Sequence, residues 1–331
     1  MVEHLLEIAL ITYNRSDFLN RTLAQLSTSP FCNNKITVYD NNSSDNTADV
    51  CLRYQELFSN LHIVRHRKNI GGGANYLRAI ELSTLRYTWI ICDDDHYDFS
   101  DCNDVLNAIT EEKCDLIWVS DQHLESWEKG LETTSYELLK RGARYYPALS
   151  FIPAVIFRTT LFDSDCLVGG YHNMDNLYPL FHFIHRSVCR NFSIYVARNP
   201  MVIRGLDSSG TGVSPFSQYV SWVKCCFSIS DRYLRSRAIG DLTLQGGGFF
   251  KNLLIVVADE KIAPTFNRKR FWQNVILINL SYNLKQRLLF LILLSTALLL
   301  PCAFIRKIKE MRYRSRGETL REFDPRDIFY D

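Results

Sequence analysis

The first hundred residues alternate short apolar runs with longer segments whose apolar residues recur at helical spacing. The apolar runs cover residues 5–12, 36–39, 61–65 and 87–92. Helices are predicted between them, the first with Ser16 as its N-cap and the second over residues 48–58. Strand–helix repeats of this length predict a mostly parallel sheet that is flanked by helices and connected by right-handed crossovers.

A polar cluster follows each of these four predicted strands. The clusters are residues 12–15, 40–42, 69–73 and 93–95. Because ligands of a parallel sheet collect at the carboxyl ends of its strands, we expect all four clusters to line one crevice. One such cluster alone is weak evidence, whereas four in equivalent positions indicate a ligand-binding site.

The most acidic of these clusters is the triplet Asp93, Asp94 and Asp95, which directly follows the apolar run 87–92. Three carboxylates at the point where a strand leaves the core are unfavourable unless a positive charge lies on them. Hard oxygen ligands suit Mg²⁺ or Mn²⁺, and such an ion would carry a diphosphate here. The alternative is a solvated acidic turn that caps the next helix.

The other clusters suit a nucleotide. Asp40 can accept a hydrogen bond from a base or ribose, and Arg15 supplies a cation near phosphate or base. Glycines 71–73 let the backbone approach a ligand closely, although a turn before a helix would use them equally well. The GxxxxGK[ST] pattern of a P-loop is absent, and GxGxxG does not follow the first strand.

In combination the clusters resemble the family 2 glycosyltransferases of the GT-A fold. The matching motifs are Thr12-Tyr13-Asn14-Arg15, Asp40-Asn41-Asn42-Ser43-Ser44-Asp45, Asn69-Ile70-Gly71-Gly72 and Asp93-Asp94-Asp95. The resemblance covers roughly residues 5–97. It implies a Rossmann-like, mostly parallel α/β sheet and an inverting transfer of a sugar from a nucleotide-diphosphate donor with Mg²⁺ or Mn²⁺.

The same resemblance implies roles for individual residues. Asp95 would ligate the metal and Asp94 would meet the ribose or sugar, but the triplet departs from a simple Asp-x-Asp pattern, so Asp93 and Asp94 could exchange roles. The full set implied for nucleotide-sugar binding is Thr12, Tyr13, Asn14, Arg15, Asp40, Asn42, Asn69, Gly71, Asp93, Asp94 and Arg204. Arg204 would neutralise the leaving diphosphate, and the equal alternative is that it forms an ion pair on the surface.

An inverting transfer needs a base that deprotonates the acceptor hydroxyl. By the resemblance this base is a carboxylate well past the acidic triplet, and Asp175 fits, although it would equally well cap the helix predicted over 180–188. His182 is the second candidate for the base, and a packed histidine is its commoner role on such an aromatic face. The Trp-Gly-x-Glu-Asp pattern of many relatives is missing, which leaves the base open.

Two shorter matches concern the acceptor. Tyr178-Pro179 and the segment 202–205 are similar to the abequosyltransferase-like branch, whose members add deoxysugars in bacterial O-antigen synthesis. Residues 120–150 are polar and aromatic, as an acceptor-facing insertion would be. A polyprenyl-diphosphate-linked oligosaccharide is the acceptor that fits an enzyme working at a membrane surface.

The C-terminal third indicates where the reaction takes place. Residues 288–305 carry no charge, and basic residues flank them on both sides. A spanning helix needs about 17 to 25 residues, and a single span would send the basic tail outside, against the positive-inside rule. We expect in-plane or re-entrant insertion with the basic flanks on anionic lipid, and a buried helix pair broken at Pro301 is the alternative.

Composition narrows the remaining classes. The chain has 331 residues, and the net charge of +2, from 38 basic and 36 acidic residues, indicates no nucleic-acid partner. Hydrophobic content of 47% excludes disorder. Ten cysteines without CxxC spacing, Cys92 and Cys189 among them in apolar runs, predict free, mostly buried thiols. The first residues resemble no secretory signal, so we expect a cytoplasmic chain, peripheral on the inner face of the membrane.

The expected organisation is a GT-A domain over residues 1–210, a helical extension over 211–285 and a membrane-attachment segment over 286–331. The expected function is a metal-dependent glycosyltransferase that acts on a lipid-linked saccharide. A nucleotidyltransferase would need a Gly-rich, lysine-bearing N-terminal loop, which residues 12–15 do not provide. A catalytically inactive scaffold at the membrane surface is the other alternative.

Overall fold

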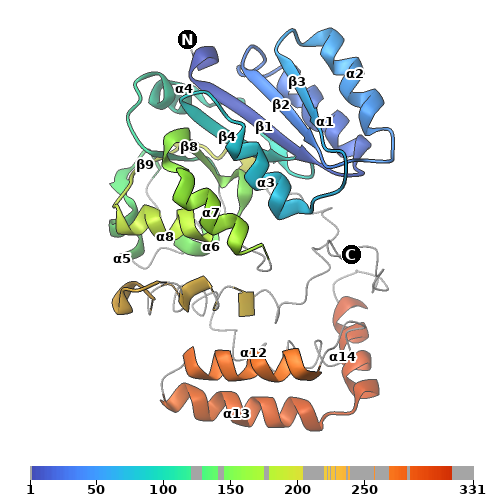
Figure 1. Cartoon of the computed structure of the whole chain (residues 1–331), viewed down its shortest axis with the longest axis vertical. Helices are drawn as coiled ribbons and strands as arrows, with labels where there is room; N and C mark the ends of the chain where they lie inside the picture. Colours follow the sequence, from blue (N-terminus) through green and yellow to red (C-terminus); the bar gives the residue numbers. More distant parts are fainter. Residues whose placement is uncertain are drawn as a thin grey trace. The chain divides into compact units, whose positions relative to one another are not determined.

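The structure is a computed structural model, and it describes residues 2–120, 129–140, 145–174, 179–203, 268–281 and 284–314, with a few further residues between 220 and 257. The chain divides into two compact units, Met1–Ser208 and Ser209–Asp331. Figure 1 shows the helices and strands of both units.

An eight-stranded sheet forms the centre of the first unit, with the order β3-β2-β1-β4-β8-β6-β9-β7. Its strands are β1 Leu6–Thr12, β2 Lys35–Asp40, β3 Leu61–Arg65, β4 Tyr87–Cys92, β6 Leu116–Trp118, β7 Glu132–Thr134, β8 Val155–Arg158 and β9 Ser193–Val196. Strands β3, β2, β1 and β4 run parallel, whereas β8 is antiparallel to both β4 and β6. The predicted mostly parallel α/β sheet is confirmed.

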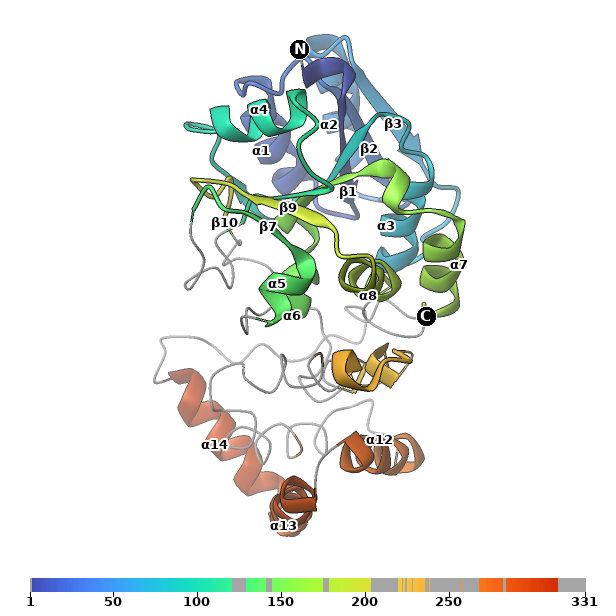
Figure 2. The same cartoon turned by 90° about the vertical axis from the view of Figure 1, so that its left-hand side faces the viewer.

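Helices cover both faces of this sheet (Figure 2). They are α1 Ser16–Ser27, α2 Thr47–Leu57, α3 Gly72–Glu81, α4 Asn103–Thr110, α5 Ser135–Lys140, α6 Tyr145–Leu149, α7 Ser164–His172 and α8 Phe181–Cys189. Apolar residues of α1, α2 and α4 share one core cluster with alternate residues of β1 and β4. This alternation follows from the two-residue period of a strand, which sends successive side chains to opposite faces. Helix α3 packs on β1 and β4 and also contacts α7.

Helix α1 begins one residue earlier than the sequence predicts. Its N-cap is Arg15, and the backbone N–H of Ser16 donates to Asp45 Oδ2 at 2.9 Å. The prediction of Ser16 as N-cap is therefore wrong. A carboxylate from the turn after β2 binds a free N–H group of the helix start, as a local cap would.

The cysteines all lie at described positions, and all ten are free thiols. Six are buried, Cys32 and Cys92 are partly exposed, and Cys189 and Cys302 are exposed. For Cys189 the expectation of burial from its apolar surroundings is wrong, because this residue ends α8 and lies on its outer side.

The second unit contains α12 Arg268–Ser281, α13 Leu284–Leu299 and α14 Cys302–Arg314. Phe271 and Val275 of α12 pack in one cluster with Phe290 and Leu294 of α13. The apolar run 288–305 is divided between two helices, because Pro301 cannot continue α13. In the part of the chain that the structure describes, no helix has the length and apolarity needed to cross a membrane. Most of the helical extension predicted before residue 268 lies outside the described residues.

Candidate active site

The polar clusters meet at one edge of the sheet, as the sequence predicts. Thr12 at the end of β1 is the register partner of Asp40 at the end of β2, and Asp40 is the partner of Arg65 at the end of β3. On the other side of β1, Ile11 pairs with Cys92, the last residue of β4. The ends of four neighbouring parallel strands therefore bring these loops together.

Asp93 points back into the fold. Its carboxylate accepts a hydrogen bond from Thr12 Oγ1 at 2.6 Å and lies 3.2 Å from Arg15 Nη1, and Thr22 Oγ1 donates to its backbone carbonyl at 3.0 Å. Burial raises the pKa of Asp93 to about 6, against the lowering by Arg15 and by the Thr12 hydrogen bond. This aspartate holds the acidic turn in place.

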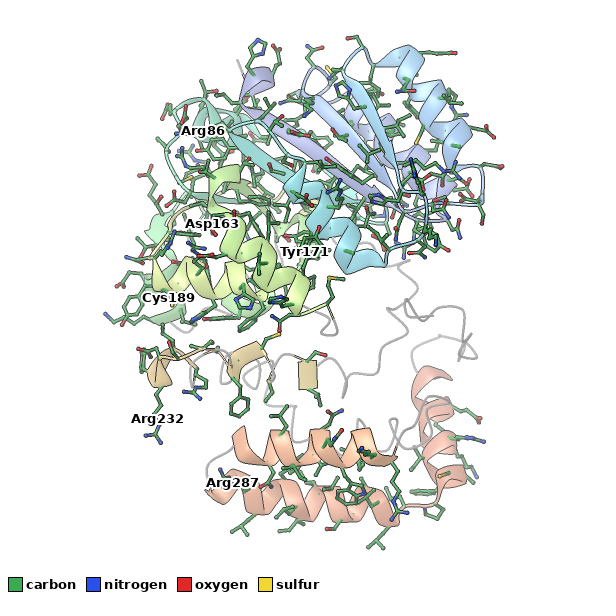
Figure 3. The ribbon with its side chains drawn as sticks, in the orientation of Figure 1. Arg86, Asp163, Tyr171, Cys189, Arg232 and Arg287 are labelled. Atoms are coloured by element: carbon green, nitrogen blue, oxygen red, sulfur yellow. The ribbon has the colours of Figure 1, made fainter. Side chains whose placement is uncertain are left out.

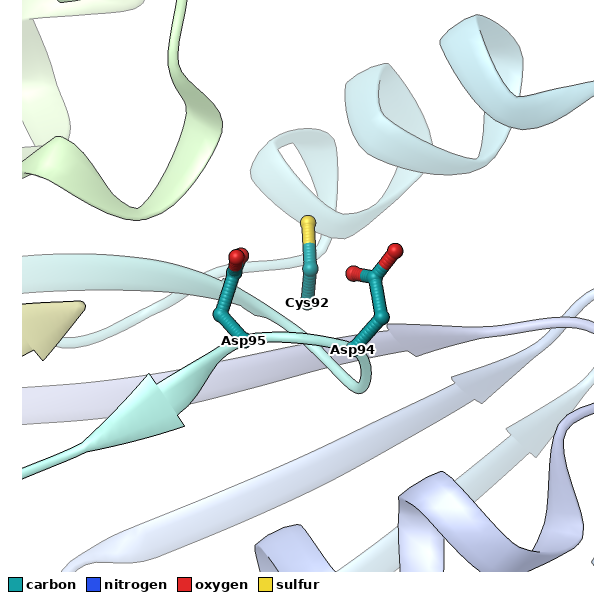
Figure 4. A group of neighbouring side chains, drawn as sticks. All are labelled: Cys92, Asp94 and Asp95. Carbon is teal, nitrogen blue, oxygen red and sulfur yellow. The ribbon is translucent and has the colours of Figure 1, made fainter. Parts of the chain in front are cut away.

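Asp94 and Asp95 face the same space as Cys92 (Figure 4). One ligand atom from each of the three residues lies within 4.8 Å of the other two. Burial, together with the neighbouring aspartates, raises the pKa of the Cys92 thiol well above its ordinary value. The thiol therefore stays protonated, and the two carboxylates are the hard oxygen donors that suit Mg²⁺ or Mn²⁺. These residues fit a divalent ion.

Asp40 is buried at the end of β2 and is held by its own loop. Its Oδ1 accepts from the backbone N–H of Ser43 at 2.8 Å, and Oδ2 lies 3.5 Å from Arg65 Nε. Arg65 also donates to the carbonyl of Ser43 at 2.7 Å. The sequence analysis did not predict Ser43 and Arg65 as partners of Asp40. For Arg65, its position at the end of a strand next to β2 could have indicated the contact.

The loop after β1 is bound directly to the loop after β2. The N–H of Asn14 donates to Ser43 Oγ at 2.9 Å, and Asn14 Oδ1 accepts from the N–H of Ser44 at 2.7 Å. Asn14 and Asn42 both have positive φ, which asparagine tolerates better than most residues. Tyr13, between Thr12 and Asn14 in the sequence, is half-buried. Asn14 and Asn42 therefore shape the loops of the site.

The loop after β3 is bound to the same edge. Asn41 Nδ2 donates to Asn69 Oδ1 at 2.7 Å, and Asn41 Oδ1 accepts from the N–H of Ile70 at 2.9 Å. Gly71 has φ 85 and ψ 153, a conformation that is essentially restricted to glycine. Asn41, which the sequence analysis did not single out, thus positions the predicted residues Asn69 and Gly71.

Helix α7 packs against both α3 and α8, and His182 lies on α8. His182 Nε2 lies 2.9 Å from Asn173 Nδ2, and a Cβ on Gly169 would lie only 2.6 Å from the His182 ring. Burial, with a smaller effect from His172, lowers the pKa of His182. His182 is therefore a packed side chain between α7 and α8. The predicted residues Asp175 and Arg204 lie outside the described residues.

Comparison with known proteins extends this picture. The family model described as Glycosyl transferase family 2 matches residues 7–158, from β1 to the end of β8. No curated protein sequence matches the chain.

Several solved structures have the same fold. Residues 1–349 of S. aureus TarS, in complex with UDP-GlcNAc, superpose with a TM-score of 0.58 at 16% identity, covering 97% of each chain. The UDP complex of the same protein gives 0.59 at 15% identity, again over 97% of each chain. The mannosyltransferase PcManGT from Pyrobaculum calidifontis, with GDP-Man and Mn²⁺, gives 0.53 at 12% identity over 88% of this chain and 86% of that one. In a longer TarS structure the chain spans 50% of the length.

At these identities the superpositions show a GT-A-like fold, and the family match adds a glycosyltransferase family 2 domain over residues 7–158. Together they support a glycosyltransferase.

Proposed function

We propose that this chain is an inverting, metal-dependent glycosyltransferase that moves a sugar from a nucleotide-diphosphate donor to a lipid-linked saccharide. The observation that carries the proposal is the meeting of four strand-end loops. Asp94 pairs with Arg15 and lies in one group with Asp95, and buried Asp40 ends the neighbouring strand β2 opposite Thr12. Carboxylates for a metal, a cation for phosphate and an acceptor for a nucleoside are the groups that such a donor needs.

In this proposal the loops after β1, β2 and β3 bind the nucleotide. Thr12, Tyr13, Asn14, Arg15, Asp40, Asn42, Asn69 and Gly71 form that part of the site. Asp40 is suited to a base or ribose donor, because it is a buried acceptor at the end of β2. The glycine conformation of Gly71 leaves room for the ligand to approach the backbone.

Asp95 would hold Mg²⁺ or Mn²⁺, with Asp94 on the ribose, the sugar or the same ion. The ion, when bound, neutralises charge on the leaving diphosphate. S. aureus TarS has been solved in complex with UDP and with UDP-GlcNAc, and PcManGT in complex with GDP-Man and Mn²⁺. These similar structures favour a nucleotide-sugar donor here. Binding experiments would identify the base and the sugar of that donor.

Asp175 is the proposed base that deprotonates the acceptor hydroxyl. It follows Met174 in the sequence, and a Cβ on Gly73 of α3 would lie 3.2 Å from Met174 Cε, so Met174 lies beside the start of α3. His182 is the second candidate, but its Nε2 already lies at hydrogen-bonding distance from Asn173. Arg204 would bind the leaving diphosphate.

The proposed acceptor is a polyprenyl-diphosphate-linked oligosaccharide, and the chain would work on the inner face of the cytoplasmic membrane. Helix α13 supports this, because Leu288, Leu291, Ile292 and Leu299 are all exposed along one side of it. Exposed Arg306 and Lys307 of α14 would meet anionic headgroups. A deoxysugar product of the O-antigen type, as in the abequosyltransferase-like branch, is the finer part of the proposal.

Donor binding tests the proposal most directly. Thermal unfolding would be followed with Mn²⁺ and with UDP-, GDP-, CDP- and dTDP-sugars in turn. We expect a metal-dependent rise of the melting temperature with one nucleotide, since a ligand that binds only the native state stabilises it. Asp95→Ala should abolish this rise, whereas Asp49→Ala, at an exposed position of α2, should retain it. The absence of any shift with all four nucleotides would contradict the proposal.

A further inference from the structure

We propose that Arg15 is a built-in counter-ion that competes with the metal for Asp94, so that the metal binds well only together with the nucleotide diphosphate. This inference rests on the proposed function, because it concerns the same donor site. It adds an order of binding and a residue that controls it.

The first observation is the geometry of one guanidinium nitrogen. Arg15 Nη1 lies 2.7 Å from Asp94 Oδ2 and 3.2 Å from Asp93 Oδ1, so a single nitrogen serves two carboxylates. Hydrogen bonds between ionised groups are the stronger kind. In this structure Asp94 is therefore neutralised by the protein itself.

The second observation separates the two aspartates. The side chain of Asp93 is 3% exposed and accepts a further hydrogen bond from Thr12, whereas that of Asp94 is 16% exposed. Asp94 also belongs, with Asp95, to the group whose ligand atoms lie within 4.8 Å of one another. Asp94 is thus the carboxylate that Arg15 and a metal ion would share.

Electrostatics then fixes the order of events. A guanidinium and a divalent cation repel each other within one small, partly buried site, where charges interact several times more strongly than in water. A diphosphate offers Arg15 an alternative partner with several anionic oxygens. Binding of the nucleotide therefore draws Arg15 away from Asp94 and lets the metal occupy its place.

The test measures Mn²⁺ binding without nucleotide, by the electron paramagnetic resonance signal of free aqueous Mn²⁺. Arg15→Gln should bind Mn²⁺ alone at least about tenfold more tightly than the wild type, because it removes a unit charge beside the site. Arg86→Gln is the matched control. Arg86 comes directly before β4, at the opposite end of that strand from the acidic triplet, and it is half-exposed and pairs with Glu112 (Figure 3). Its replacement by glutamine removes the same charge.

A conservative variant guards against a folding defect in Arg15→Gln. Arg15→Lys keeps a charge beside buried Asp93, but one ammonium group on a shorter stem holds both carboxylates less well. It should tighten binding of Mn²⁺ alone by a smaller factor, about threefold. Circular dichroism confirms that each variant is folded before its affinity is compared.

The outcomes are distinct. If Arg15→Gln and Arg15→Lys bind Mn²⁺ alone no more tightly than wild type, while wild type binds Mn²⁺ in the presence of UDP, GDP, CDP or dTDP, the inference is overturned and the proposed function stands. If no variant binds Mn²⁺ under any of these conditions, the metal site itself is wrong and the proposed function fails with it. Tighter binding by both Arg15 variants, with Arg86→Gln like wild type, supports the inference.

Discussion

The hydroxyl of Thr12 lies 2.6 Å from Oδ2 of Asp93, and it joins the last residue of β1 to the first residue after β4. Both side chains are buried. The backbone ladder between the two strands ends with Ile11 and Cys92, so this bond extends the connection one step beyond the sheet. It holds the acidic turn at the height where Asp94 and Asp95 reach the site.

Thr12→Val tests this connection. Valine has nearly the same shape but no donor, so the buried carboxylate of Asp93 loses one hydrogen bond. We expect a loss of about 1–3 kcal/mol in the free energy of unfolding, measured by urea denaturation. Thr110→Val removes an exposed hydroxyl that bonds within α4 and should change stability by less than about 0.5 kcal/mol. Equal effects of the two substitutions would show that the Thr12–Asp93 bond has no special weight.

Much of the fold and the position of the site could be predicted from the sequence. Apolar runs gave the strands at 5–12 and 87–92 nearly to the residue, since a strand buried on both faces is a largely continuous apolar segment. Parallel strands also end on one side, so polar clusters at 40–42 and 93–95 had to lie at the same edge. Both inferences depend only on the order of apolar and polar residues and not on where individual side chains lie.

The contacts between loops could not be predicted in the same way. Asp45 binds the N–H of Ser16, and Asn41 binds Asn69, because β2 lies between β1 and β3. Strand order is set by packing between residues that are far apart in the sequence. The residues around Ser16 therefore do not indicate that Asp45 binds its N–H. The sequence leaves the break at Pro301 as an alternative, since an uncharged run of this length also suits a membrane.

Gly71→Ala tests the loop after β3. An alanine at φ 85 and ψ 153 is strained by about 1–3 kcal/mol, so we expect the loop to rearrange or the protein to lose that much stability. Because Asn69 accepts from the N–H of Gly71 at 2.8 Å, rearrangement would displace Asn69 as well. Affinity for the nucleotide, measured by calorimetry, should fall severalfold. Gly130→Ala, also at positive φ but on the β7 side of the sheet, is the control, and it should leave that affinity unchanged.

Asp175→Asn and His182→Gln separate the two candidate bases. If Asp175 is the base, its amide variant should keep metal-dependent donor binding and lose sugar transfer by at least about 100-fold, the usual scale of general base catalysis. His182→Gln should retain transfer within a few fold, because its ring is packed against Gly169 and bonded to Asn173. Full activity of Asp175→Asn together with an inactive His182→Gln would reverse this assignment.

The half-buried position of His182 also predicts a pH effect on stability. Burial lowers its pKa below the ordinary value of 6.5, so the unfolded chain binds the proton more readily. Stability should therefore decrease as the pH falls below about 6.5 and through the lower pKa of the folded state. Urea denaturation between pH 8 and pH 5 should show a larger loss for wild type than for His182→Gln. His62→Gln, at an exposed position of β3, is the control, and a His182→Gln profile that matches wild type would contradict the prediction.

The exposed side of α13 makes the membrane proposal testable without truncating the chain. Leu288 and Ile292 are 57% and 63% exposed and lie four residues apart, so they share one side of the helix. Replacing both with serine should weaken co-sedimentation with vesicles of phosphatidylglycerol and phosphatidylcholine by about tenfold or more, because two aliphatic side chains would no longer be buried in lipid.

The matched control for this pair is Leu52→Ser with Leu57→Ser, since these leucines of α2 are 60% and 70% exposed and lie in the first unit. Their replacement removes a similar exposed apolar area and should leave vesicle binding unchanged. Binding should also fall on pure phosphatidylcholine vesicles, because Arg306 and Lys307 then lose their anionic partners. If the Leu288 and Ile292 double variant sediments with anionic vesicles as well as wild type does, α13 does not contact the bilayer. The lipid-linked acceptor would then need another route to the site.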